Sequence, residues 1–245
     1  MFKLNKLIKK GAIFILSFFA FRKEVENMKI EEISIKSDEY PQILRNIYDP
    51  PTKLYILGNK KILNQKGIAI VGSRNATLYG KKMAFKFAKE LSEQGINIIS
   101  GLAIGIDSYA HLGNLQAQDS KQTVGKTIAV LGSGIDNIYP KENIEIARKI
   151  IQTGGCIISE YPCGTKPDKL HFPQRNRIIS GLSKGVLVVE ASDKSGALIT
   201  TDFALEQGKE VFAIPGEITN KNSKGCNELI RDGARMVLSP QEISL

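Results

Sequence analysis

Three glycine-rich loops, each directly after a short run of β-branched residues, are the features of this sequence best suited to holding an anion. They are Gly72-Ser73-Arg74, the segment Gly101 to Asp107 with Gly105 inside it, and Gly132-Ser133-Gly134. Glycine lets backbone amides approach an anion closely, and the N-terminus of a following helix adds unpaired N–H groups. One such loop is most simply a tight turn. Three at consecutive strand ends favour a phosphate site.

A fourth candidate loop and two acidic residues accompany these segments. Ser195 and Gly196 precede an apolar helical segment, where they either hold a phosphate or cap the helix. Asp107 follows Gly-Ile at the start of an expected helix, and an N-cap role is favoured for it. Glu190 ends a buried strand, so we expect it to orient loop amides or an arginine.

The segment from His171 to Leu182 is the most unusual stretch of the sequence. Arg175 and Arg177 stand two residues apart, and Phe172 precedes them. We expect His171, next to Phe172, to lie in a loop. Two guanidinium groups bind phosphates well, and an aromatic ring stacks on a base. The alternative places Phe172 in the core and one arginine in a salt bridge with Glu160 or Glu190.

Tyr139-Pro140-Lys141 supplies another ring and another cation just after the third glycine loop. Tyr139 taken alone is more typical of a packing residue. Lys141 is therefore a candidate for binding phosphate, in addition to Arg74.

Signatures of catalysis and cofactor binding are missing from the sequence. Gly132-Ser133-Gly134 begins a dinucleotide-binding fingerprint, but Asn137 occupies the third glycine position. There is no Walker A lysine, no G-x-S-x-G motif, and no His or carboxylate cluster with metal-ligand spacing. We therefore expect a binding protein without enzymatic activity, cofactor or metal. The three cysteines have no C-x-x-C spacing, as expected of inert thiols in a reducing cytosol.

The charge balance points to a polyanionic partner. Lys plus Arg outnumber Asp plus Glu by 34 to 25, giving a net charge of +9 and a pI of about 9.3. Residues 1–27 carry six basic and two acidic side chains, so +5 remains on residues 28–245. Their apolar run, 12–21, is shorter than the ~20 residues that a spanning helix needs. We interpret 1–27 as a mis-assigned start or a disordered tail, and Met28 as the more credible start.

From Gly67 onward the sequence alternates short apolar runs with segments of helical periodicity. Strands are predicted at 68–71, 97–99, 127–131, 156–158, 186–189, 211–214 and 235–238. Ala84, Phe87, Ala88 and Leu91 form one apolar stripe of a helix that Thr77 caps. Strands apolar on consecutive positions are buried on both faces, which indicates a doubly wound, mostly parallel α/β sheet.

The domain organisation follows from this pattern. Residues 67–240 are predicted to form a Rossmann-like domain, 28–66 a short N-terminal lead-in, and 241–245 a C-terminal tail. Within the lead-in, residues 54–57 are expected to form a short edge strand. In such folds the ligand lies at the carboxyl ends of the strands.

Taken together and in order, these motifs resemble the DNA-processing protein A family (DprA, also called Smf). The resemblance rests on Gly72-Ser73-Arg74, Ser100 to Asp107, Gly134-Ile135-Asp136 with Tyr139-Pro140, Phe172 to Leu182, Val189-Glu190-Ala191 with Lys194 to Ala197, and Val211 to Gly216. It spans roughly Tyr40 to Leu238. Each motif alone is weak, but their combination is highly specific.

The resemblance implies a cytoplasmic, non-membrane protein that binds single-stranded DNA in natural transformation. Such proteins protect incoming strands, help to displace single-strand binding protein, load the RecA recombinase and form homodimers through the later part of the Rossmann-like domain. The family's DNA pocket maps onto Arg74, with Lys141, Lys169 and the Arg175/Arg177 pair as matching or adjacent candidates. This chain differs from many members in lacking a helical N-terminal module and a C-terminal winged-helix module, so the resemblance does not extend to what these modules add.

Two other functions are compatible with the residues. The first is a protein or enzyme that binds nucleotides or phosphoribosyl compounds in the same glycine-lined crevice, with Glu190 and Asp107 contacting ribose or acting as acid and base. The second is an adaptor that mainly binds proteins and whose basic face is solvated surface. A steep fall of oligonucleotide affinity with salt would favour DNA binding.

Overall fold

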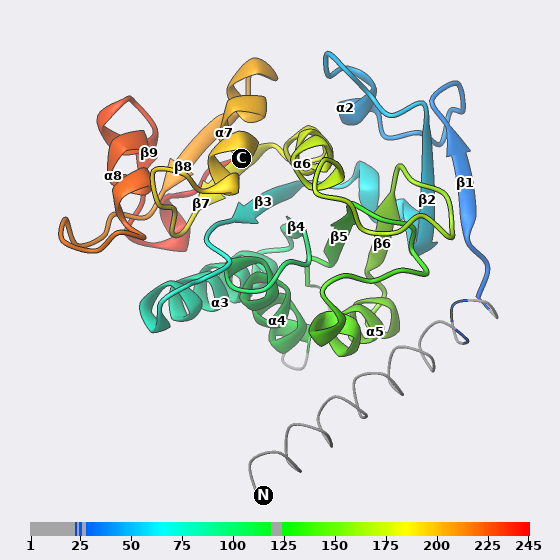
Figure 1. The fold of residues 1–245 in the computed structure, drawn as a ribbon, viewed down its shortest axis with the longest axis horizontal. Coiled ribbons are helices and arrows are strands. Elements are labelled where there is room, and N and C mark those ends of the chain that lie inside the picture. Colours follow the sequence, from blue (N-terminus) through cyan, green and yellow to red (C-terminus); the bar gives the residue numbers. More distant parts are fainter. Residues whose placement is uncertain (1–22, 24, 26–27, 119–123) are drawn as a thin grey trace, which may run out of the picture.

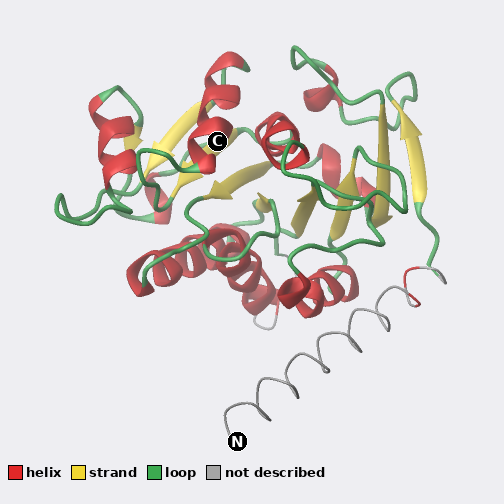
Figure 2. Cartoon of the chain, viewed as in Figure 1, coloured by secondary structure: helices red, strands yellow, loops and turns green. Residues whose placement is uncertain are grey.

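The computed structural model describes residues 23, 25, 28–118 and 124–245. Most of the segment 1–27, interpreted above as a mis-assigned start or tail, lies outside the described residues. One mixed sheet of nine strands runs through the described part of the chain, in the order β1-β2-β6-β5-β4-β3-β7-β8-β9. Helices cover both of its faces (Figures 1 and 2).

The central strands are parallel, and they follow the predicted pattern closely. They are β3 (Gly67–Val71), β4 (Asn97–Ser100), β5 (Thr127–Leu131), β6 (Cys156–Ser159), β7 (Gly185–Val188), β8 (Glu210–Ala213) and β9 (Arg235–Met236). The chain winds from β3 outward to β6, and then returns to β7 on the other side of β3. This confirms the predicted doubly wound, Rossmann-like fold class. The last strand is shorter than the predicted 235–238.

The lead-in contributes two antiparallel strands to the same sheet. They are β1 (Glu31–Ser34) and β2 (Lys53–Gly58), and β2 pairs with β1 on one side and β6 on the other. The prediction that residues 54–57 form an edge strand is therefore wrong in its position. The sequence of β1 has one buried residue, Ile33, among its four, and so carries little apolar signal.

One face of the sheet is covered by α3 (Leu78–Glu93), α4 (Ile106–Gln118) and α5 (Ile144–Gln152). The expected stripe of α3 is buried on this face, and the Thr77 side chain accepts a hydrogen bond from the Gly80 amide at the start of the helix. Gly95 follows α3 with a φ of 81°, which is the left-handed conformation expected at that position.

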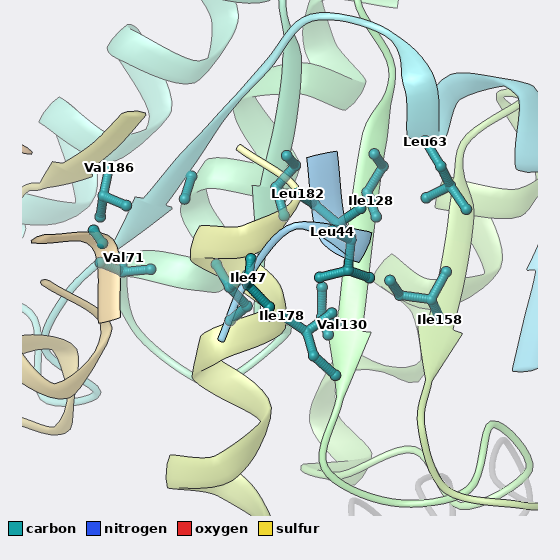
Figure 3. Packing of buried hydrophobic residues seen from close by; sticks show 14 of the residues in the cluster. Leu44, Ile47, Leu63, Val71, Ile128, Val130, Ile158, Ile178, Leu182 and Val186 are labelled. Carbon is teal, nitrogen blue, oxygen red and sulfur yellow. The ribbon is translucent and has the colours of Figure 1, made fainter. Parts of the chain in front are cut away.

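The opposite face carries α2 (Gln42–Arg45), α6 (His171–Gly181), α7 (Gly196–Glu206) and α8 (Lys224–Arg231). Leu44 of α2, Ile178 of α6 and Val130 of β5 meet in the apolar cluster beneath these helices (Figure 3). Three 3₁₀ turns complete the described elements: η1 (Lys60–Asn64), η2 (Lys141–Asn143) and η3 (Pro240–Glu242). His171 begins α6, so the prediction of a loop at that residue is wrong.

Within these ranges, no helix has both the length and the apolar character needed to cross a bilayer.

Candidate nucleic-acid interface

A pocket of about 680 Å³ lies beyond the carboxyl ends of β3 and β7. These two strands are neighbours, but the chain leaves β3 towards α3 on one face and β7 towards α7 on the other. Their loops therefore diverge, and a crevice opens between them. Gly72, Ser73 and Arg74 line one side of the pocket, and Ser195 and Gly196 line the other.

The mouth of this pocket carries a guanidinium group and two aromatic rings in a row. The guanidinium carbon of Arg74 lies 5.4 Å from the centre of the Phe172 ring. The Phe172 ring is 5.7 Å from that of Tyr139, centre to centre, and tilted by 35°. Arg74 and Tyr139 are exposed, and Phe172 is partly exposed. The exposed Lys169 lines the same pocket. We call Arg74, Tyr139, Lys169 and Phe172 the mouth.

The loop that carries Arg74 is held by the adjacent strand. The carboxylate of Glu190, which is 2% exposed, accepts hydrogen bonds from the Thr77 amide at 2.9 Å and from the Thr77 hydroxyl. The Glu190 carbonyl accepts a further hydrogen bond from the Ser73 amide at 2.7 Å. Glu190 thus fixes the loop from both of its ends. Two roles are predicted for Glu190, orienting loop amides or an arginine. Its hydrogen bonds correspond to the first.

The glycines of the predicted anion loops have two different surroundings. Gly72 and Gly196 line the pocket. A Cβ atom at Gly196 would meet no atom within 4 Å, whereas one at Gly72 would lie 2.6 Å from the Ile106 side chain. Similarly, a Cβ at Gly101 would lie 2.6 Å from the Arg175 guanidinium, and one at Gly105 would lie 2.3 Å from the Ser73 carbonyl. Gly101 and Gly105 therefore permit close packing between loops.

The third glycine loop also serves packing. A Cβ at Gly132 would lie 3.0 Å from the Phe172 ring, and one at Gly134 would lie 2.6 Å from the Pro162 carbonyl oxygen. Gly101, Gly105, Gly132 and Gly134 are not among the residues that line the pocket. The structure thus does not bring all three glycine loops to one anion. Instead, the first loop meets the N-terminus of α7, where the Ser195 hydroxyl accepts from the Ala197 amide.

Arg175 and Asp107 form the buried floor of the pocket. The Arg175 guanidinium donates to the carbonyl oxygen of Gly101 at 2.7 Å and to that of Val130. The Asp107 carboxylate accepts from the Gly101 amide at 3.1 Å and the Ala103 amide at 3.4 Å, both before its own helix. It thus holds the loop instead of capping α4.

Burial works against both floor charges. Burial raises the pKa of Asp107, while Arg175 and the two loop amides act in the opposite direction. Burial lowers the pKa of Arg175 to about 10, so its guanidinium keeps its proton at neutral pH. The floor charges offset one another, and Arg74 and Lys169 supply the excess positive charge of the described lining.

Arg177 does not reach the pocket. Its guanidinium group forms a salt bridge with Glu160 at 2.7 Å and a second with Asp49 at 2.9 Å, and its side chain is only 6% exposed. Burial is the largest single influence and lowers the pKa of Arg177, but the hydrogen bonds and charges of Glu160 and Asp49 together outweigh it and raise that pKa. Consecutive residues of a helix are rotated by about 100° around its axis. Arg175 and Arg177 are two such steps apart, so their side chains point into different surroundings. The salt bridge to Glu160 is the alternative that the sequence left open.

Lys141 is exposed at the start of η2 and lies outside the pocket lining, two residues beyond Tyr139. Tyr139 taken alone is more typical of a packing residue, whereas in the structure this residue is 50% exposed at the mouth. The pocket also contains polar residues that sequence reasoning did not single out: Asn75, Asn176, Ser192 and Thr200. Their positions next to motif residues were the available signal. In the described part of the chain, no group of three His, Cys, Asp or Glu residues could hold a metal ion.

The fold and the pocket together define a doubly wound α/β protein with a cationic, ring-lined pocket at its topological switch point. The family model of DNA recombination-mediator protein A matches residues 31–245. The chain belongs to this family. It is 45% identical to DNA processing protein DprA of Bacillus subtilis (strain 168) over 215 residues, which cover 87% of this chain and 70% of the relative.

Other relatives and two solved structures agree. Protein Smf of Escherichia coli (strain K12) is 44% identical over 86% of this chain and 55% of its own length. The X-ray structure of DprA from Streptococcus pneumoniae has a TM-score of 0.80 and 44% identity, covering 89% of this chain and 75% of that one. A structure of DprA from Helicobacter pylori, described for its single-stranded DNA binding mode, has a TM-score of 0.76 and 31% identity, covering 87% and 93%.

Proposed function

We propose that this protein binds single-stranded DNA in the pocket between β3 and β7 and acts in the processing of DNA during natural transformation. The family and the single-stranded DNA binding described for the Helicobacter pylori relative support this function. The observation that carries it is the row formed by Arg74, Phe172 and Tyr139 at the mouth. This row lets a single nucleotide contact the cation with its phosphate and a ring with its base.

The proposed mechanism is binding without bond-making. Arg74 and Lys169 neutralise backbone phosphates and release condensed counterions, which makes the affinity fall steeply with salt. Phe172 and Tyr139 stack on bases, and because every base has a π-face, this contact carries little sequence preference. Lys141 extends the cationic surface beside Tyr139. Arg175 and Arg177 are left out of direct DNA contact in this proposal because both are buried and hydrogen-bonded.

The finer parts of the function come from the family resemblance. They are protection of incoming strands, displacement of single-strand binding protein, loading of RecA and formation of a homodimer in the cytoplasm. A homodimer would offer two mouths to one strand, and the second would then bind at a high effective concentration. RecA loading is tested by the lag before RecA hydrolyses ATP on DNA coated with single-strand binding protein. We expect the wild-type protein to shorten this lag and Arg74→Ala to leave it unchanged.

The central test is a fluorescence anisotropy titration of a labelled oligo-dT strand at several salt concentrations. The variant Arg74→Ala/Lys169→Ala removes two mouth cations. The matched control Lys82→Ala/Lys86→Ala removes two exposed cations from α3. We expect the mouth variant to lose at least tenfold in affinity and about 1.4 units of salt slope, because each phosphate contact contributes ~0.7 on single strands. Equal losses in both variants would refute the pocket assignment.

The same titration tests the small-ligand alternative. Competition with a mononucleotide such as dTMP, at concentrations that saturate a phosphate site, separates the two functions. If the pocket serves a strand, dTMP displaces it poorly, because one nucleotide forms only part of the contacts. If dTMP binds as tightly as the strand and raises the melting temperature equally, the pocket serves a nucleotide.

A further inference from the structure

A second pocket of about 680 Å³ lies at the opposite edge of the sheet, before the amino ends of β3 and β7. Lys66 directly precedes β3, and Lys184 directly precedes β7. The Lys184 amide donates to the Gly67 carbonyl at 2.9 Å, so the two lysines emerge from adjacent strands. The five residues of β3 separate this amino-edge pocket from the mouth by ~17 Å.

The amino-edge pocket is cationic. Lys66 and Lys184 are exposed, and its lining within the described residues contains no acidic side chain. Neither lysine forms a salt bridge with another described residue. Lys209 lies near Lys184. Burial, and then the positive charge of Lys184, lower the pKa of Lys209, so the two lysines repel one another. Like charges held together without an acidic side chain between them favour an anionic ligand.

The remaining lining residues narrow the class of anion. Four carboxamide side chains, from Gln42, Asn46, Asn64 and Gln65, surround the lysines. Carboxamides both donate and accept hydrogen bonds, as the N–H and C=O groups of a peptide require. The apolar part consists of Ile43, Leu182 and Leu245.

Among the described residues, the lining of the amino-edge pocket lacks two kinds of side chain that the mouth contains. It contains no aromatic ring on which a base could stack and no arginine to bind phosphate in a bidentate manner. From this combination, we propose that the amino-edge pocket binds an acidic peptide segment of a partner protein, with carboxylates on Lys66 and Lys184 and an apolar side chain on Ile43 and Leu182. The segment 1–22 of this chain is a poor occupant, because its charged side chains are all basic.

The proposal is tested with a fluorescein-labelled peptide of four aspartates followed by two leucines, titrated with the full chain and followed by anisotropy. We expect saturable binding that is at least tenfold weaker in Lys66→Gln/Lys184→Gln. A second variant, Asn46→Asp, keeps the size of an exposed side chain and adds a repelling carboxylate, so it should also weaken binding. Lys82→Gln/Lys86→Gln serves as the control with the same loss of charge and should bind normally.

Three outcomes would overturn the proposal. The first is no saturable binding of the acidic peptide at concentrations up to about 1 mM, which corresponds to a binding free energy of about −4 kcal/mol. The second is equal binding of a peptide with asparagines in place of the aspartates, which would mean an apolar or non-specific contact. The third is displacement of the peptide by oligo-dT in the Arg74→Ala/Lys169→Ala variant, which would identify a second nucleic-acid site. Urea unfolding of each variant confirms that the comparison is made on folded protein.

Discussion

The mouth of the proposed DNA pocket and the buried arginines of α6 use the same residue type for different purposes. Arg74 at the mouth is exposed and faces an aromatic ring. Arg175 and Arg177 are 4% and 5% exposed, and each is hydrogen-bonded to the protein itself. A guanidinium group free to meet solvent can exchange water for phosphate, whereas one that is already paired cannot do so without leaving buried groups unsatisfied. The difference separates the arginine proposed to bind DNA from the arginines that hold the protein together.

Removal of a buried arginine should have the largest effect on folding. Arg177→Met leaves Glu160 without its partner in a site where its side chain is 12% exposed. We expect the free energy of unfolding to fall by about 3–5 kcal/mol, as for other broken buried pairs. Urea unfolding followed by circular dichroism measures this change. Lys224→Met breaks an exposed pair with Asp193 and should cost less than about 1 kcal/mol. Similar losses in the two variants would contradict the distinction.

Removal of the ring at the mouth should affect DNA binding more than folding. Phe172→Ala eliminates stacking, which we expect to weaken oligo-dT binding by about 1–3 kcal/mol, or roughly 5- to 150-fold. The measurement is the anisotropy titration described above. Phe172→Tyr keeps the ring and should retain most of the affinity. A Phe172→Tyr variant as weak as Phe172→Ala would show that ring stacking is not the contact that matters.

The burial of His111 on α4 predicts that the free energy of unfolding depends on pH. Burial, and then the charge of Arg175, lower the pKa of His111 to about 3, whereas the ordinary value is 6.5. Between these values the unfolded chain takes up the proton first, so His111 favours folding above pH 6.5 and this contribution is lost as the pH falls towards 3. The slope is at most about 1.4 kcal/mol per pH unit.

The variant His111→Gln tests this dependence with urea unfolding at a series of pH values. We expect its stability to fall less steeply on acidification than that of the wild type. Parallel curves for the two proteins would mean that other groups cause the acid sensitivity.

Removal of the exposed Arg74 side chain should have the smallest effect on folding. Arg74→Ala should alter the free energy of unfolding by less than about 0.5 kcal/mol, because the side chain is exposed. The same variant should lose much of its DNA affinity. Thermal or urea unfolding provides the measurement. A loss of several kcal/mol would mean that Arg74 is part of the folded framework and that its DNA effect is indirect.

Much of the fold could be predicted because its signals are local. The segment from Thr77 to Gly95 contains the cap, the apolar stripe and the left-handed glycine of α3. The central strands are apolar at consecutive positions, which marks burial on both faces. The edge position expected for residues 54–57 was wrong because strand order depends on pairing with β6, which lies about a hundred residues further along the chain.

The site was only partly predictable for the same reason. Motifs point to Arg74 and Phe172, the family resemblance points to Lys169, and the structure brings the three together in one pocket. The same motifs could not reveal that Arg177 turns towards Glu160, or that Gly101 makes room for Arg175. The sequence leaves the role of Tyr139 open between packing and the binding surface, because the exposure of a single ring depends on neighbours distant in sequence.

The sequence by itself determined most of the alternation of strands and helices along residues 67–240, the excess of basic residues and the candidate motifs, since each follows from local periodicity or composition. Only the tertiary structure decided which cations are exposed and which are paired, and which glycine loops meet at the pocket. Burial and hydrogen bonding depend on contacts between residues far apart in the chain. An arginine reads the same in the sequence whether its guanidinium group faces solvent or a buried glutamate.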